Sequence, residues 1–213
     1  EDIELLVCDV IPDLKKKIPV DIQTNRLPPS HKVKPYLFLD SISQGNDLII
    51  QPKIVYGTPP VAEIIGEELK ILGGYIPFRD RNRELQLRRR ATNILHLPIG
   101  PKTIFTGEKA VDFASLVLRY MKKEQDWVVK KEVLNSFQRV DGFTPQIVME
   151  EENFDVDWGP ASEEAVFSAW REGSSLVRLS SGGWAPIPEK WLKEYGYLVA
   201  SLLESKRKNS NQE

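Results

Sequence analysis

The sequence is poor in the residues that most often form disulfides or bind zinc. It has one cysteine, Cys8, and two histidines, His31 and His96. A single cysteine cannot form an internal disulfide, and without a CxxC motif a structural zinc site is not expected. Low cysteine usage fits a reducing, cytoplasmic environment. We expect Cys8 to be a small packed side chain, and each histidine to be a surface or hydrogen-bonded residue rather than a catalytic base.

Long apolar runs are also missing. None approaches the roughly 18 residues of a membrane span, so no membrane partner is expected, and no segment has the pattern of a signal peptide. The 213 residues are 41% apolar, enough to bury a core in one or two domains. Because 29 basic and 31 acidic residues nearly cancel, local charge matters more than the net charge of −2. The sequence starts at Glu1 without a methionine, and we expect it to be a piece of a longer protein.

The common catalytic motifs are missing as well. The sequence has no Walker phosphate loop, no GxGxxG, no GxSxG and no HExxH. The segment Gly100-Pro101-Lys102-Thr103 resembles a phosphate loop only superficially, because Pro101 removes an amide donor and the preceding glycine spacing is missing. We therefore predict no catalytic residues, no metal and no cofactor in this part of the protein.

One acidic cluster could in principle bind a hard cation. It consists of Glu150, Glu151, Glu152, Asp155 and Asp157. The two aspartates alternate with apolar residues and therefore lie on the solvent side of an expected strand, while the glutamates fall in a turn. A solvated strand edge that discourages pairing with other strands explains the cluster as well as a cation site does.

The N-terminal half mixes strands and helices. Alternating residues predict two strands, 35–42 and 47–56, joined by the turn residues Gln44-Gly45-Asn46. Pro52 argues for an edge position or a bulge in the second strand. Apolar spacing predicts helices over 2–17, 82–95, 107–123 and 132–139, and less certain strands over 61–65, 75–78 and 127–129. The helix over 107–123 is apolar over more than half of its circumference and should be central to the core.

The C-terminal part repeats this mixture on a smaller scale. Ser162 is suited to begin a helix that ends at Gly173, and Pro188 is suited to the first position of a last helix. Strands are expected over 146–150, 154–158, 176–179 and 184–187. We predict an α+β fold of antiparallel hairpins packed by helices. A larger domain is expected over 1–150, and a small helix–hairpin–helix unit over 151–213.

The most distinctive charged stretch is IPFRDRNRELQLRRR, which contains six arginines. They are Arg79, Arg81, Arg83, Arg88, Arg89 and Arg90. Three interpretations remain open: an ordinary exposed helix face with local ion pairs, contact with a phosphate backbone, and docking to an acidic protein surface. Aromatic residues are not interleaved with the arginines, so the sequence does not support base stacking here.

The tryptophans also have two interpretations. Four of the five lie between residues 158 and 191, where large rings give a small unit much buried area. Core packing accounts for them, but Trp184 and Trp191 are also candidate partner-binding residues.

A resemblance to a known family covers most of the sequence. The segment FDVDWGPASEEAVFSAWREGSSLVRLSSGGWAPIPEKWLKEYG is similar to the end of the region that precedes the motor in bacterial Swi/Snf-family helicase-like ATPases. The matching residues are Phe154, Asp155, Asp157, Gly173, Arg178, Leu179, Gly183, Trp184, Pro188, Trp191 and Leu192. The N-terminal stretches LPPSHKVKPYLFLDS, IVYG, FRDRNRELQLRRRATNIL, GEKAVDFA and DWVV follow the family order more weakly.

The resemblance implies that the full-length protein is a DNA-stimulated ATPase that remodels protein–DNA or related complexes. Its motor would lie C-terminal to this region and would alone bind ATP and Mg. The chain would then be a noncatalytic accessory domain that positions or regulates the motor, with the motor, DNA and a remodelled protein as expected partners. The alternative is a protein–protein interaction adapter.

Overall fold

The chain has a mixed α+β fold, as its sequence pattern predicts. The computed structural model describes residues 3, 6–24, 27, 30–123, 126–150 and 153–201. They form two compact units, the first made of Glu1–Phe105 with Ser115–Leu134, and the second of Thr106–Ala114 with Asn135–Glu213. The segment 135–150, which the sequence analysis assigns to the larger domain, lies in the second unit.

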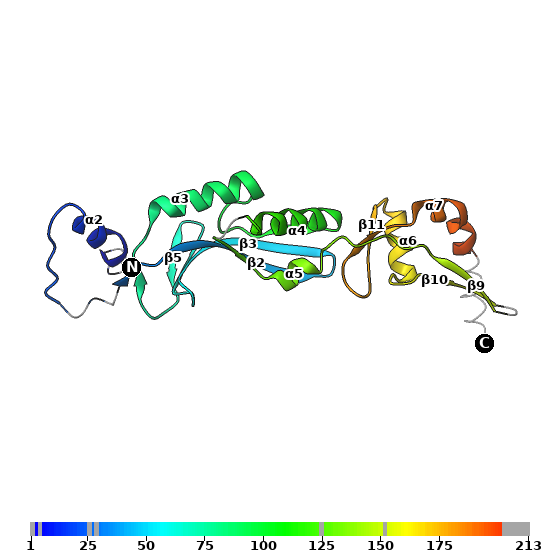
Figure 1. Cartoon of the computed structure of the whole chain (residues 1–213), viewed down its shortest axis with the longest axis horizontal. Coiled ribbons are helices and arrows are strands. Elements are labelled where there is room, and N and C mark those ends of the chain that lie inside the picture. The colour runs from blue at the N-terminus through cyan, green and yellow to red at the C-terminus, as the bar shows by residue number, and fades with distance from the viewer. Residues whose placement is uncertain are drawn as a thin grey trace. The chain divides into compact units, whose positions relative to one another are not determined.

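The first unit is built on a twisted sheet (Figure 1). Strands β2 (Pro35–Gln44) and β3 (Asp47–Tyr56) form the predicted hairpin, which turns at Gly45 with φ 57°. The other strands are β4 (Ala62–Ile65), β5 (Glu68–Ile71), β7 (Thr103–Thr106) and β8 (Trp127–Val129). The order is β5-β4-β3-β2-β8, with β8 parallel to β2 and β7 paired to β3.

Of the two positions expected for Pro52, an edge or a bulge, the edge position is wrong, because β3 lies inside the sheet. The ladder between β3 and β4 covers only Ile54 to Tyr56 on β3, so Pro52 needs no amide hydrogen for it. Pro52 is paired with Leu39 of β2. The Pro52 carbonyl accepts a 2.8 Å hydrogen bond from the amide of Gly100.

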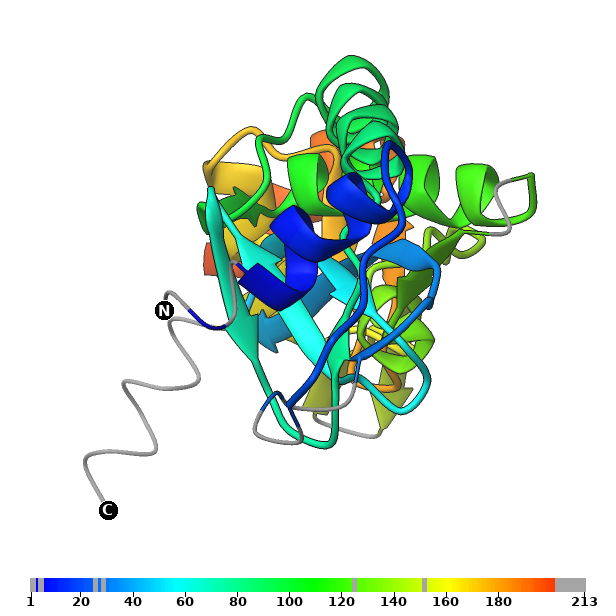
Figure 2. The same ribbon diagram turned by 90° about the vertical axis from the view of Figure 1, so that its left-hand side faces the viewer.

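Helix α3 (Arg81–Arg90) continues into the π-helical turn η2 (Ala91–Leu95) and lies against the sheet (Figures 1 and 2). The predicted apolar stripe is buried at Leu87, Ala91 and Leu95. The carboxylate of Asp80 accepts a 3.0 Å bond from the amide of Arg83 and so caps the helix.

The N-terminal segment is helical only in part. The π-helical turn η1 (Leu6–Val10) leads into α2 (Ile11–Lys15), which is shorter than the helix predicted over 2–17. Pro12 stands in the first turn of α2, where a missing amide hydrogen costs no helical bond. Cys8 is buried beside Val7 and Ile76, as expected for a packed thiol. Ile76 belongs to β6 (Ile76–Pro77), which pairs in parallel with β1 (Ser30–His31).

Helix α4 (Glu108–Met121) confirms the prediction of an apolar helix. Its buried residues are Ala110, Val111, Phe113, Ala114 and Val117. The short helix predicted over 132–139 is α5 (Lys131–Asn135).

The second unit contains the predicted helix–hairpin–helix. A first hairpin, of β9 (Gln146–Glu150) and β10 (Asn153–Asp157), precedes the helix–hairpin–helix in the chain. Helix α6 (Glu163–Arg171), the hairpin of β11 (Leu176–Arg178) and β12 (Trp184–Pro186), and α7 (Glu189–Trp191) with the π-helical turn η3 (Leu192–Gly196) follow. These elements share one apolar core that includes Val156, Val166, Val177, Ala185 and Leu192. Among the described residues, no helix has the length and apolarity that crossing a membrane requires.

Candidate functional site

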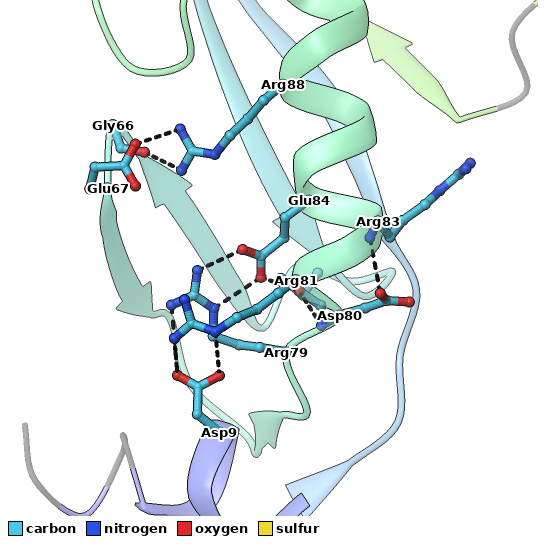
Figure 3. A network of polar contacts seen from close by, with 10 residues as sticks. Asp9, Gly66, Glu67, Arg79, Asp80, Arg81, Arg83, Glu84 and Arg88 are labelled. Atoms are coloured by element: carbon cyan, nitrogen blue, oxygen red, sulfur yellow. Dashed lines mark hydrogen bonds and ion pairs between the residues drawn. The ribbon is translucent and has the colours of Figure 1, made fainter. Parts of the chain in front are cut away.

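The basic stretch singled out from the sequence forms α3 and the strand-to-helix junction before it. At its centre Glu84 is buried, at 4% exposure. The Tyr56 hydroxyl donates to Glu84 Oε1 at 2.6 Å, and Arg79 donates from Nε to Oε1 at 2.9 Å and from Nη2 to Oε2 at 2.6 Å. Figure 3 shows Arg79 and Glu84 facing each other across this two-bond contact. The Tyr56 hydroxyl in turn accepts from the amide of Asp80 at 3.0 Å.

This geometry fixes the protonation of the network. Burial raises the pKa of Tyr56, and its bond to Glu84 raises it further, so the phenol keeps its proton. Burial alone would raise the pKa of Glu84, but the bonds from Arg79 and Tyr56 outweigh it and hold that pKa below its ordinary value. Since both oxygens of Glu84 already accept bonds from the chain itself, the network is arranged to hold β3 and α3 together rather than to exchange protons with a substrate.

A second carboxylate ties the N-terminal segment to the same arginines. Asp9, on η1, accepts from Arg81 Nη2 at 2.6 Å and from Arg81 Nε at 3.3 Å. Its Oδ2 also lies 3.9 Å from Arg79 Nη1. These ion pairs connect distant parts of the sequence, since Arg81 and Asp9 are 72 positions apart.

The remaining arginines of the stretch are mostly engaged within the chain. Arg83 donates to Gln86 Oε1 at 2.9 Å and pairs with Asp126. Arg88 donates to the carbonyl of Gly66 at 2.6 Å and pairs with Glu67 Oε1 at 3.0 Å. Arg90 is half-buried and has a partner too, whereas Arg89 is exposed. The six arginines thus mainly join α3 to its surroundings, which matches the interpretation as a helix with local ion pairs.

A pocket of about 730 Å³ opens beside the start of α3, between it and the N-terminal segment. Three separate stretches line it: 8–16, 32–34 and 78–82. Its basic side chains are Lys15, Lys16, Lys32, Lys34, Arg79 and Arg81, its acidic ones are Asp9, Asp13 and Asp80, and Phe78 supplies an aromatic ring. Figure 2 looks toward this end of the first unit, with η1 and α2 in blue nearest the viewer.

The charges of the pocket do not cancel. Asp9 is engaged by Arg81, Asp13 pairs with Lys16 at 2.8 Å, and Asp80 caps α3. Lys15, Lys32 and Lys34 are exposed and have no carboxylate partner among the residues that the structure describes. The pocket therefore carries an excess of positive charge on three side chains that are open to solvent.

The sequence analysis missed this site. Lys15 and Lys16 fall at the end of the helix expected over 2–17, and Lys32 and Lys34 stand just before the strand expected over 35–42. The pairing of β1 with β6 brings Lys32 and Lys34 beside Arg79. In this pairing His31 faces Pro77, and the Phe78 amide donates to the His31 carbonyl at 3.0 Å. A parallel pair of two-residue strands leaves no signal in a single sequence.

The two candidate tryptophans differ in access. Trp184 is 3% exposed and stacks on Phe137, with ring centroids 6.4 Å apart. Trp191 is half-buried, with its ring 5.3 Å from that of Trp158 and 5.6 Å from that of Tyr195. Trp184 is therefore part of the core, and of the two only Trp191 presents any surface to a partner.

The remaining candidates from the sequence, the two histidines and the described members of the acidic cluster, do not line the pocket. The His31 ring meets Tyr75 edge-on at 4.7 Å, and His96 ends η2 with φ 55°. Asp155 and Asp157 accept bonds from nearby backbone amides, while Glu151 and Glu152 lie outside the described residues. Within the described part of the chain, no three His, Cys, Asp or Glu side chains are grouped so as to hold a metal ion.

No known protein family, curated protein or solved structure matches this chain.

Proposed function

We propose that this chain is a noncatalytic accessory domain of a bacterial Swi/Snf-type DNA-dependent ATPase, and that it holds nucleic acid at the pocket beside α3. The observation that carries the proposal is the gathering of three exposed lysines, Lys15, Lys32 and Lys34, around one opening, with no ion-pair partner for them among the described residues. The sequence resemblance given above supports the family assignment. ATP and Mg would be bound by the motor of the full-length protein.

The chemistry of the pocket suits a phosphate backbone. Lys15, Lys32 and Lys34 are exposed ammonium groups that form no ion pair with a carboxylate in the described structure, so they can neutralise phosphates and release counterions. Arg79 and Arg81 are paired with Glu84 and Asp9, so their charges are balanced within the chain and the three lysines supply the excess positive charge. Contacts of this kind bind nucleic acid without reading its sequence.

The noncatalytic part of the proposal is supported by the state of the best acid–base candidate. Glu84 is the one buried carboxylate among the residues that the structure describes in the first unit, and its oxygens accept hydrogen bonds from Tyr56 and Arg79. To test this part, we would incubate the chain with ATP, Mg and DNA. ATP turnover that survives controls for contaminating ATPases would overturn it.

Charge reversal tests the nucleic-acid part. The variant Lys15→Glu/Lys32→Glu/Lys34→Glu should weaken binding to a fluorescein-labelled duplex at least tenfold at low salt, measured by anisotropy. The matched control Lys70→Glu/Lys102→Glu/Lys123→Glu reverses three exposed lysines of the same unit that do not line the pocket. Equal losses in the two variants, or no binding by the unmodified chain even at low salt, would reject the pocket as the interface.

The adapter alternative, with Trp184 and Trp191 as anchors, has less support. An anchor residue needs a ring that a partner can cover, and Trp184 is already covered by Phe137 and its neighbours.

A further inference from the structure

The β9–β10 hairpin of the second unit has features that the proposed function does not use. Its register pairs Gln146 with Asp157, Ile147 with Val156, and Val148 with Asp155. No third strand joins it among the described residues, so β9 and β10 each keep one edge whose backbone groups are unpaired in the sheet. A two-stranded hairpin alone is marginally stable in water, and a third strand is the usual remedy.

The hairpin is covered on the β10 side and open on the β9 side. Val156 is 6% exposed and belongs to the core of the second unit. Its cross-strand partner Ile147 is 45% exposed, and Val148 and Met149 are 39% and 75% exposed. Three consecutive apolar residues on β9 thus face solvent, on both faces of the strand. In Figure 1 the hairpin extends away from α6 toward its turn.

The charge of the hairpin has one sign. Asp155 and Asp157 are exposed on the face opposite Val156, and each uses one oxygen to accept a backbone amide at 2.8 Å. The turn sequence Glu150-Glu151-Glu152 adds three more acidic residues. The β9 strand of a second copy, Gln146–Glu150, has no basic side chain to balance these carboxylates, so a basic segment fits this edge better than a second copy does.

We propose that the open edge of β9 receives an extended segment of a partner protein in which apolar and basic residues alternate. Backbone hydrogen bonds would extend the hairpin to three strands, which is the strand-addition mode of peptide recognition. Apolar side chains of the added strand would pack beside Ile147 and Met149, on the face shared with Val156.

Basic side chains would occupy the opposite face. There Val148 lies between the open edge and Asp155, which is two strand spacings or about 10 Å from an added strand. A lysine or arginine stem can cover Val148 while its charged end reaches toward Asp155. This arrangement accounts for an exposed valine beside an exposed aspartate, and it selects a basic segment over an acidic one.

The test uses a fluorescein-labelled peptide of eight residues, alternating lysine and valine, with an alternating glutamate–valine peptide as its control. We expect saturable binding of the basic peptide and at least tenfold weaker binding of the acidic one. The variant Ile147→Lys/Met149→Lys should lose at least tenfold in affinity for the basic peptide. The control Leu198→Lys changes another exposed apolar residue of the same unit, 61% exposed, and should stay within twofold. Circular dichroism verifies that each variant is folded.

Several results would overturn the proposal. They are no saturable binding of the basic peptide, equal binding of the acidic peptide, equal losses in the two variants, and dimerisation of the unmodified chain that Met149→Lys abolishes. The Lys15→Glu/Lys32→Glu/Lys34→Glu variant should bind the peptide normally, so failure at the pocket and failure at the hairpin are distinguishable.

Discussion

The substitution Glu84→Gln tests whether the Tyr56–Glu84–Arg79 network holds the first unit together. Glutamine keeps the size of the side chain and one acceptor for the Tyr56 hydroxyl, but it removes the negative charge that faces Arg79. The Arg79 side chain is 11% exposed, so its guanidinium would remain buried with only Asp9, 3.9 Å away, to balance it.

The size of the loss follows from that burial. Removing one partner of a buried ion pair costs about 3–5 kcal/mol, because an uncompensated charge is left behind. The residual contact with Asp9 places Glu84→Gln at the lower end, about 3 kcal/mol, or roughly a hundredfold in the unfolding equilibrium constant. Urea denaturation followed by circular dichroism measures this change.

Glu67→Gln is the matched control, because Glu67, in the turn between β4 and β5, pairs with an arginine of α3. Glu67 pairs with Arg88 at 3.0 Å, but its side chain is 92% exposed. Exposed pairs are worth about 0–1 kcal/mol. If the two variants lost equal stability, the claim that burial makes the Glu84 network structural would be refuted.

The stability lost in Glu84→Gln has a defined pH dependence. Because the pKa of Glu84 is lower in the folded chain than its ordinary value of 4.5, its ionised form is favoured by folding. Its contribution to stability is therefore complete above that ordinary value and is lost as the pH falls through the lower, folded-state pKa. The difference between the unmodified chain and Glu84→Gln should be constant near neutral pH and shrink in acid. A difference that grew in acid would contradict this assignment.

Three further predictions concern other positions. Gly100→Ala should lower the free energy of unfolding by several kcal/mol in urea denaturation, because Gly100 has a φ of 108° and a Cβ there would lie 2.3 Å from the amide nitrogen of Gly66. Gly45→Ala, with open space around the new Cβ, should lower it by about 1–2 kcal/mol. Equal losses in the two variants would show that Gly66 moves aside. Trp184→Ala should cost about 3–5 kcal/mol in the same assay, since the ring is buried against Phe137, and a loss under 1 kcal/mol would argue that the hairpin around it is not packed. Replacing Arg88, Arg89 and Arg90 together by alanine should weaken DNA binding less than reversal of the pocket lysines and slightly flatten its salt dependence; a larger loss would move the interface to the end of α3.

Elements whose signals are local could be predicted from the sequence. The β2–β3 hairpin follows from alternation around Gln44-Gly45-Asn46. The cap at Ser162 follows from its position before the first turn of the expected helix, and its hydroxyl accepts a hydrogen bond from the amide of Ala165. The wide apolar face of α4 likewise predicted its buried residues.

What the sequence could not supply were contacts between distant segments. The pairing of Asp9 with Arg81 and the enclosure of a pocket by 8–16, 32–34 and 78–82 depend on how the chain returns on itself. For the same reason the partners of the six arginines could not be foreseen, although their helix was. The edge position expected for Pro52 is wrong because a proline can lie in an inner strand, at a residue that the ladder with the neighbouring strand β4 does not include.

Lysine footprinting is the most direct test of the claim that nucleic acid binds at the pocket beside α3. The chain is acetylated with a limiting reagent, with and without DNA, and the modification of each lysine is quantified by mass spectrometry. DNA should protect Lys15, Lys32 and Lys34 while Lys70 and Lys102, exposed elsewhere on the same unit, react as before. Uniform labelling under conditions where DNA is bound, or protection of Lys70 and Lys102 instead, would contradict the account.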